Sequence, residues 1–307
     1  MELSIVIPAF NEAESFPDLL SEICRALSSF GKSYEILIVD DGSRDNSLQV
    51  LRKLKKQYPQ LRVVSFRKNY GKSAALAQGF QQSRGKIVVT MDADLQDDPA
   101  EIPRLIEKLE EGYDLVSGWK KKRYDPISKK LPSRLFNFVT ARVTGLPIHD
   151  FNCGLKVYRR EVLDSIQLYG ELHRFLPALA HWQGFRISEI PVRHHPRKFG
   201  KTKFGPSRFF NGFFDLITVL FLTRFRTTPL HIFGLAGGFT FFLGLCIEAY
   251  LTVLWFMGHS IRNRPLFFLG ILLLIVGIQF IVFGLLGEML SAGFAENVHY
   301  SVKEEIE

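Results

Sequence analysis

Five acidic residues crowd into one short segment, VVTMDADLQDDPAE, at residues 88 to 101. Asp92 and Asp94 are two residues apart, so in an extended chain their side chains project to the same side. There they can share one hard cation, with Gln96 offering a further oxygen. On spacing alone, a metal site and a solvated acidic loop both remain open.

The remaining acids of this segment suit a structural role. The β-branched run before them is typical of a buried strand, and Pro99 suits the first turn of a helix, so the acids lie in a strand-to-helix loop. Asp97 and Asp98 are expected to serve that helix, one of them as its N-cap, and Glu101 suits the positive end of its dipole.

Short apolar runs alternate with helical patterns through the first 118 residues. The expected strands are 3–8, 34–40, 61–66, 86–92 and 113–118, with a helix after each of the first four. Such alternation predicts a parallel sheet covered by helices on both faces, with ligands bound beyond the carboxyl ends of the strands. Polar residues collect at those ends: Asn11, Glu12, Asp40, Asp41, Arg67 to Lys72, Asp92 and Asp94. The sequence therefore predicts one functional rim.

The composition points to lipid and to an anionic partner. The 307 residues are 47% hydrophobic and carry a formal net charge of +8. The three cysteines form no CxxC pair, which argues against a zinc site or a disulfide framework. The N-terminus lacks a basic region and reads as a first strand, not as a signal peptide.

Two apolar runs in the C-terminal part, 229–257 and 266–286, each exceed the roughly 20 residues that span a bilayer. Phenylalanines at helical spacing beside arginines predict an interfacial helix over 207–228. The segment 131–143 is either a second interfacial helix or an ordinary amphipathic helix. Glu248 is expected near the far interface or facing the partner helix. The basic excess before the first span places the N-terminal part in the cytoplasm.

Several common functions are excluded by missing residues. GKS at 71 to 73 suggests a phosphate-binding lysine, but a Walker A motif would need glycine where Phe66 stands. No GxGxxG follows the first strand, which disfavours a nicotinamide dehydrogenase. The basic residues lie beside the membrane-entry segments, so nucleic-acid binding is not expected.

An ordered set of motifs resembles glycosyltransferase family 2, and within it the polyprenyl-phosphate glycosyltransferases. The motifs are VIPAFNE, VDDGSRDNS, NYGKSAALAQG, DADLQDDPAEI, DFNCGLKVYRR, HRFLPAL and VRHHPRKFGKTKFG. The likeness covers about residues 3 to 228, and the two apolar runs match membrane-anchored bacterial members. It implies a GT-A fold, an α/β architecture with a mainly parallel sheet, and it favours the metal site.

The resemblance also implies roles by position. Asp92, Asp94 and Gln96 would bind Mg²⁺ or Mn²⁺ and, with Arg197, form the catalytic group. The nucleotide sugar would contact Pro8, Phe10, Glu12, Asp40, Asp41, Gly71, Lys72, Asp150 and Lys156, and Gly154 belongs to the same DFNCGLK loop. The lipid phosphate would contact Lys120, Lys130, Ser133, Arg134 and Lys203. The run SGWKKKR, which contains Lys120, departs from the arginine-aromatic pattern of mannose synthases.

The implied enzyme transfers one sugar, with inversion, from a UDP-glucose-like or GDP-mannose-like donor to a polyprenyl monophosphate such as undecaprenyl phosphate. A processive polysaccharide synthase is the enzymatic alternative, disfavoured because AHWQGFR replaces the QxxRW signature. A catalytically silent nucleotide-sugar binder is the other, disfavoured by the presence of both Asp92 and Asp94.

The expected organisation has a cytoplasmic catalytic domain at 1–206, the interfacial helix at 207–228, a two-helix anchor in the inner membrane at 229–290 and a cytoplasmic tail at 291–307. The oligomeric state, including a homo-oligomer, is left open.

Overall fold

The computed structural model describes residues 1–28, 30–121, 127–166, 168, 170, 172–196, 198, 229–260 and 265–295. The chain divides into two compact units, one of Met1–Val219 with Ser301–Glu307 and one of Leu220–Tyr300. The strands of the first unit are β1 (Leu3–Ala9), β2 (Tyr34–Asp40), β3 (Leu61–Ser65), β4 (Ile87–Thr90), β5 (Leu115–Trp119), β6 (Lys156–Arg159) and β7 (Ile187–Pro191).

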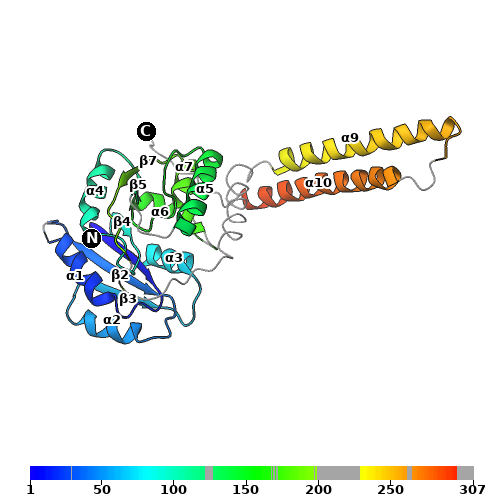
Figure 1. The fold of residues 1–307 in the computed structure, drawn as a ribbon. Helices are drawn as coiled ribbons and strands as arrows, with labels where there is room; N and C mark the ends of the chain where they lie inside the picture. The colour runs from blue at the N-terminus through cyan, green and yellow to red at the C-terminus, as the bar shows by residue number, and fades with distance from the viewer. Residues whose placement is uncertain are drawn as a thin grey trace. The chain divides into compact units, whose positions relative to one another are not determined.

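The helices of this unit follow the strands along the chain (Figure 1). They are α1 (Phe16–Ala26), α2 (Ser47–Lys55), α3 (Lys72–Gln82), the 3-10 turn η1 (Pro99–Glu101), α4 (Ile102–Glu110), α5 (Ile127–Thr144), α6 (Arg160–Asp164), the 3-10 turn η2 (Leu172–Phe175) and α7 (Leu176–Trp182).

The seven strands form one mixed sheet in the order β3-β2-β1-β4-β6-β5-β7. Parallel pairs join β3 to β2, β2 to β1, β1 to β4 and β5 to β7, whereas β6 is antiparallel to both of its neighbours, β4 and β5. The five predicted strands therefore run in one direction, as expected. The predicted mainly parallel sheet is confirmed, and the antiparallel strand β6 returns between β4 and β5 and carries the DFNCG loop to the carboxyl end of β4.

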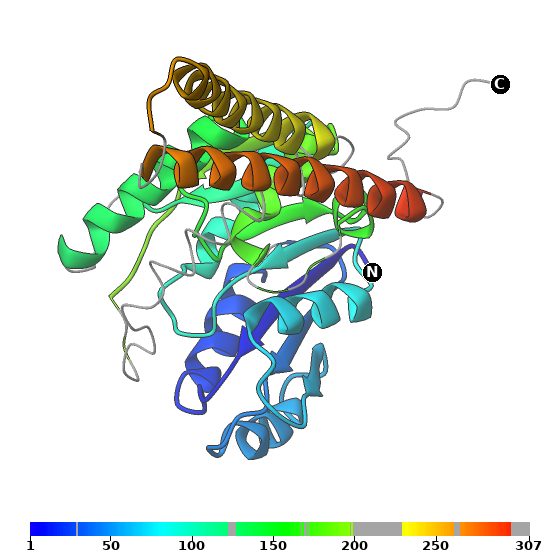
Figure 2. The same cartoon turned by 90° about the vertical axis from the view of Figure 1, so that its right-hand side faces the viewer.

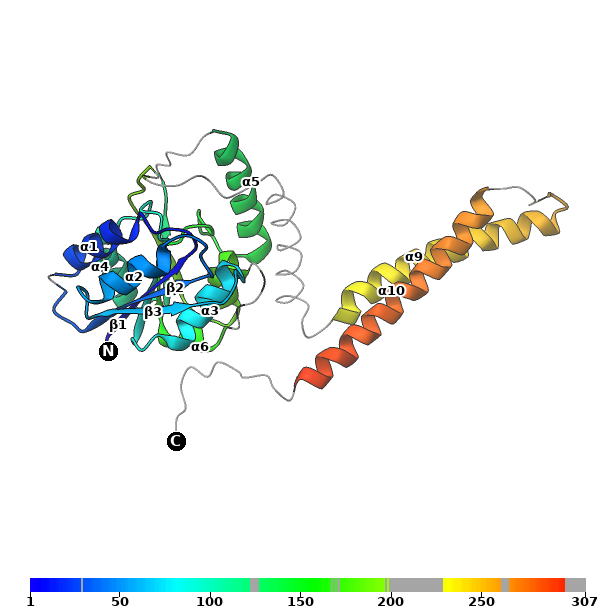
Figure 3. The ribbon, with the colours of Figure 1, turned by 90° about the horizontal axis from the view of Figure 1, so that it is seen from below.

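Helices cover both faces of the sheet, as the alternation predicts. Side chains alternate across a strand, so Ile5 and Ile7 of β1 pack with the buried residues of α1, α2 and α4, while Val6 packs with those of α3, α6 and α7. Figure 3 shows α1 and α4 on one side of the strands and α3 and α6 on the other, and Figure 2 shows α3, in cyan, lying in front of the strands.

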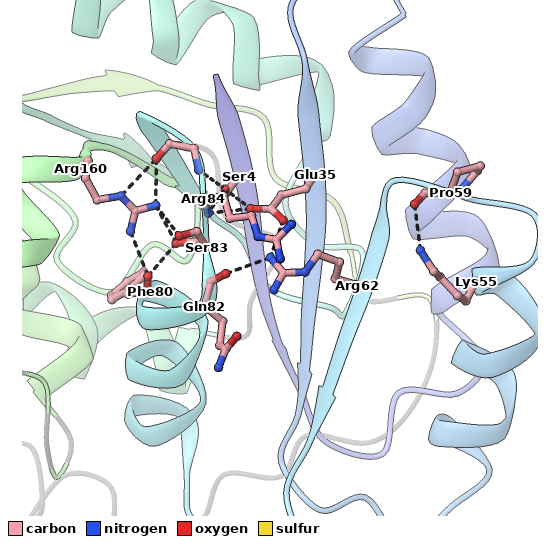
Figure 4. A network of polar contacts seen from close by, with 11 residues as sticks. Ser4, Glu35, Lys55, Pro59, Arg62, Phe80, Gln82, Ser83, Arg84 and Arg160 are labelled. Carbon is pink, nitrogen blue, oxygen red and sulfur yellow. Dashed lines mark hydrogen bonds and ion pairs between the residues drawn. The ribbon is translucent and has the colours of Figure 1, made fainter. Parts of the chain in front are cut away.

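Arg160 holds the C-terminal end of α3, at the edge of the sheet opposite the functional rim (Figure 4). Its guanidinium donates to the main-chain oxygens of Phe80 at 2.9 Å, Ser83 at 3.0 Å and Gly85 at 2.8 Å. The Phe80 carbonyl lies in the last turn of α3, where carbonyls lack a main-chain partner within the helix, and Ser83 and Gly85 follow that turn. Arg160 thus fixes a helix whose first residue, Lys72, belongs to the candidate site.

Helix α5 extends beyond the predicted segment 131–143 at both ends. One face is buried through Asn137, Thr140 and Thr144, and Phe136 packs against Phe175 of η2 at 5.7 Å between ring centroids. The opposite face exposes Phe138, over which the Arg142 guanidinium lies.

The second unit contains two long helices, α9 (Pro229–Phe256) and α10 (Pro265–Ala295), both long and apolar enough to cross a membrane. Gly237 and Gly244 of α9 face Gly277 and Gly270 of α10 closely enough that a Cβ at Gly277 would lie 2.8 Å from the Gly237 oxygen. Glu248 faces α10 beside Gly270, which agrees with the second of its two expected positions.

Candidate active site

The acidic loop after β4 alternates between buried and partly exposed side chains. Met91, Ala93, Leu95 and Asp97 are buried, and Asp92, Asp94, Gln96 and Asp98 are partly exposed. The Gln96 main-chain N–H donates to Asp94 Oδ1 at 3.2 Å, and Leu95 adopts a φ of 60° that turns the chain. The alternation agrees with the predicted projection of Asp92 and Asp94 to one side.

Asp92 forms an ion pair with Lys72, the first residue of α3. Burial favours the neutral acid, but the charges of Lys72 and Lys120 outweigh it and hold the pKa of Asp92 far below its usual value. About a third of each partner's side chain is exposed, 34% for Lys72 and 30% for Asp92. A ligand can therefore reach the pair.

Asp97 and Asp98 have different roles, which corrects one prediction. Asp98 caps η1, its Oδ1 accepting from the Ala100 N–H at 2.9 Å. The prediction that Asp97 serves the following helix is wrong, because its side chain is 1% exposed and pairs with Lys120 Nζ at 2.7 Å. Burial alone would lower the pKa of Lys120, and the charge of Asp97 raises it instead. Lys120 therefore lies inside the site, held against Asp97.

The rim predicted to bind the nucleotide is built by the ends of β1 and β2 with the segment before α3. Asp41 accepts from the main-chain N–H groups of Tyr70 at 2.7 Å and Gly71 at 2.9 Å. Asp40 accepts from Ser65 Oγ at 2.7 Å, and both carboxylates are buried. Burial raises the pKa of Asp41. Asp41 thus fixes the backbone that presents Lys72 to Asp92, and Asp40 joins the end of β2 to β3.

Gly42 allows the two loops of this rim to meet. A Cβ at this residue would lie 2.8 Å from the main-chain nitrogen of Asn69, and its φ is 67°. Only glycine adopts this conformation without cost. Pro8 lies near the end of the adjacent strand β1, and Phe10 and Glu12 follow that strand, so the predicted nucleotide residues share one edge of the sheet.

The DFNCG loop stands directly behind Asp92. A Cβ at Gly154 would lie 2.7 Å from Asp92 Cγ, and the Gly154 carbonyl accepts from Thr90 Oγ1 at 2.8 Å. Lys156 is buried, which lowers its pKa, and its Nζ donates to the carbonyls of Phe151 at 3.2 Å and Cys153. Lys156 therefore shapes the loop.

Cys153 is a packing residue in this loop, as the sequence indicates. Burial raises the pKa of its thiol to about 12, so the nucleophilic thiolate is absent at neutral pH. Asp150, also fully buried, accepts from the Asn152 N–H at 3.1 Å.

Sequence reasoning missed two groups that contact the site. Ser73 Oγ lies 2.8 Å from His173 Nδ1, joining α3 to η2 across 100 positions. Burial, then the charge of Lys72, lowers the pKa of His173 well below 6.5. The other group is His195, the last residue of VRHH, whose main-chain N–H donates to the Gln96 carbonyl at 2.9 Å. The motif HRFLPAL contains His173, but no spacing rule connects it to Ser73.

The side chains at this site can bind a divalent cation only if a substrate supplies further oxygen ligands. Among the described residues, no three His, Cys, Asp or Glu side chains are arranged to hold a metal ion. Mg²⁺ in phosphate-handling sites typically takes one or two carboxylates together with substrate phosphates and water. Asp92, Asp94 and Gln96 therefore suit a cation whose coordination a diphosphate completes.

The glycosyl transferase family 2 profile matches residues 4–167. The dodecaprenyl-phosphate galacturonate synthase of Rhizobium johnstonii is 38% identical over 302 residues, 95% of this chain and 88% of that protein. The undecaprenyl-phosphate 4-deoxy-4-formamido-L-arabinose transferase of Pseudomonas aeruginosa is 38% identical over 297 residues, 96% of this chain and 86% of that protein. The chain belongs to glycosyl transferase family 2.

The fold of this glycosyltransferase is also that of solved GT-A structures. Glucosyl-3-phosphoglycerate synthase from Mycobacterium tuberculosis, in complex with Mn²⁺, uridine diphosphate and phosphoglyceric acid, aligns with a TM-score of 0.55 at 21% identity over 72% of this chain and 77% of that one.

The residues expected to meet the lipid phosphate are placed in part. Ser133 is half-buried on α5, and Lys130 and Arg134 lie on the same helix, although their side chains are outside the described part of the structure. Arg197 and Lys203 also lie outside the described residues, so their roles stay predictions.

Proposed function

We propose that this glycosyltransferase moves one sugar from a nucleotide-diphosphate sugar to a polyprenyl monophosphate in the membrane. The single observation that carries the proposal is the pairing of an acidic family 2 site with two helices long enough to span a bilayer. Relatives that match 95% and 96% of the chain are named as transferases acting on dodecaprenyl and undecaprenyl phosphate.

The donor half of the proposed site lies at the carboxyl ends of β1, β2 and β4. Asp92, Asp94 and Gln96 would hold Mg²⁺ or Mn²⁺, which when bound neutralises charge developing on the leaving diphosphate. Asp41 fixes the loop that presents Lys72, a cation within reach of the same diphosphate. Asp150 and Gly154 would border the sugar.

The acceptor half needs cations more than a general base. A phosphate monoester has its second pKa near about 6, so at neutral pH it carries enough charge to attack the anomeric carbon directly. Direct attack inverts that carbon. Ser133, Lys130 and Arg134 of α5, with Arg197 and Lys203, would dock the phosphate through charge-assisted hydrogen bonds. Lys120, held against Asp97, would act from inside the site by its charge.

The organisation follows from the same proposal. The catalytic part, residues 1–206, would lie on the cytoplasmic side of the inner membrane, where nucleotide sugars are made. Residues 207–228 would lie at the interface, and 229–290 would anchor the chain.

The test is transfer by the purified full-length protein in detergent. Undecaprenyl phosphate and Mn²⁺ are incubated with each member of a panel of radiolabelled UDP- and GDP-sugars. We expect one donor to yield a lipid carrying one sugar, labile to mild acid. A ladder of longer products would indicate the processive alternative, and nucleotide-sugar binding without any transfer would indicate the silent binder.

A further inference from the structure

The loop at 149–152 is tied to α5 by one buried side chain. Asn137 is 7% exposed, and its Nδ2 donates to the His149 carbonyl at 2.9 Å. Its Oδ1 accepts from Asn152 Nδ2 at 3.4 Å. One amide group thus uses both its donor and its acceptor on the same loop.

The chain continues from this loop to Gly154, which contacts Asp92. Gly154 lies against the Asp92 carboxylate so closely that a Cβ there would overlap it, and Thr90 holds the Gly154 carbonyl from β4. Glu189 of β7 fixes the start of the loop, its Oε2 accepting from the His149 N–H at 2.8 Å. A continuous chain of contacts therefore runs from α5 to the acid that faces Lys72.

We propose that Asn137 is a positioning residue: it holds α5 and the loop at 149–152 in a fixed position relative to each other. The inference rests on the proposed function, in which Ser133, one turn before Asn137 on α5, meets the lipid phosphate, and the loop borders the sugar. Transfer requires the attacking oxygen and the anomeric carbon to be aligned. If the loop moved relative to α5, the donor and acceptor parts of the proposed site would separate, although every group that binds either substrate would still be present.

Asparagine is the residue that this role requires. Its amide supplies a donor and an acceptor in one plane. The substitution Asn137→Asp would keep the acceptor for Asn152 and lose the donor to His149, and alanine would lose both. Thr140 provides a matched control because it lies one turn further on the same buried face, is buried as well, and its Oγ1 has no partner among the described residues.

The experiment compares Asn137→Ala, Asn137→Asp, Asn152→Ala and the double variant Asn137→Ala/Asn152→Ala with Thr140→Val in the full-length protein. Turnover and both KM values are measured with undecaprenyl phosphate and the donor that the wild type uses. The number of binding-competent molecules is counted by calorimetry with UDP and Mn²⁺, or with GDP if the donor is a GDP-sugar. Turnover is then expressed per binding-competent molecule, which removes any loss due to misfolded protein.

We expect Asn137→Ala to lower turnover per competent molecule roughly ten- to a hundredfold, the scale of a misplacement near 1 Å, with the donor KM within about threefold of wild type. Asn137→Asp would set a buried carboxylate oxygen against the His149 carbonyl, so its turnover should fall at least as far as that of Asn137→Ala, whereas Thr140→Val should match the wild type. Asn152→Ala should lose less turnover than Asn137→Ala. The double variant should lose little more than Asn137→Ala, because that variant already lacks the hydrogen bond between the two residues.

Three results would overturn the inference: full turnover of Asn137→Ala per competent molecule, a loss equal to that of Thr140→Val, or fully additive losses in the double variant. If Asn137→Ala does not fold, Asn152→Ala decides the question by the same comparison with Thr140→Val. Failure of the wild type to transfer sugar to any polyprenyl phosphate would refute the proposed function instead.

Discussion

Replacing Lys72 should tighten the binding of a divalent cation when no donor is present. Lys72 Nζ is paired with Asp92, one of the two proposed metal ligands. A cation that approaches the free enzyme must displace this ammonium and meets its repulsion. Lys72→Met keeps the length of the side chain and removes the charge, so Asp92 becomes available.

The size of the effect follows from the exposure of the pair. Two unit charges about 4 Å apart attract by about 4 kcal/mol at an effective dielectric constant near 20. Water screens a pair whose side chains are 34% and 30% exposed, and the lysine regains hydration when released, which leaves about 1 to 2 kcal/mol. Since about 1.4 kcal/mol is tenfold in affinity, the Kd for Mn²⁺ should fall roughly tenfold.

Titration of free Mn²⁺ by electron paramagnetic resonance measures this Kd directly in the donor-free protein. Lys68→Met is the matched control, because Lys68 belongs to the same loop and its ammonium lies 5.0 Å from the centre of the Tyr70 ring instead of at the acids. An unchanged Kd in Lys72→Met, or the same change in both variants, would refute the competition between Lys72 and the metal. Turnover of Lys72→Met should fall, since the lysine is then missing from the diphosphate.

Three further outcomes test the site and the fold. Asp94→Asn should lower turnover at least roughly a hundredfold, whereas Asp98→Asn keeps N-cap chemistry and should be nearly silent in the same assay; equal losses would mean that the metal site is misread. Gly154→Ala should lower turnover on the order of a hundredfold while circular dichroism stays unchanged, because its Cβ would displace the Asp92 carboxylate. Burial alone would raise the pKa of Glu35, but its hydrogen bonds and its ion pair outweigh burial and lower that pKa from 4.5 (Figure 4). The contribution of the ionised Glu35 to the stability of the fold is therefore complete above about pH 4.5, and it is lost as the pH falls through the lower pKa of the folded state. Melting curves of wild type and Glu35→Gln should therefore converge as the pH falls below about 4, and a constant difference would contradict this account.

The main sheet and the location of the site could be predicted because both depend on local sequence patterns. The alternation of apolar runs with helical segments predicts the five like-directed strands, and parallel strands must bring their carboxyl-end loops to one edge. The period of two in an extended chain predicts that Asp92 and Asp94 project together. The length of the apolar runs predicts two helices that can span a bilayer.

Other features depended on contacts between distant parts of the chain. The short strand β6 contains two charged residues in KVYR and has no alternation that would reveal it, yet its return between β4 and β5 puts Gly154 behind Asp92. The sequence likewise assigns Asp97 to the following helix and leaves Lys120 to the lipid phosphate.

By itself, the sequence determined which residue types stand at which strand ends, because hydrophobic periodicity fixes the elements and so the rim where their loops meet. Only the tertiary structure decided the partners: Lys72 with Asp92, Lys120 with Asp97, and Asn137 with the loop at 149–152. A buried charge or amide must find a complementary group wherever the packed chain supplies one. That group is set by the order of strands across the sheet and the packing of helices on it, which no local pattern encodes.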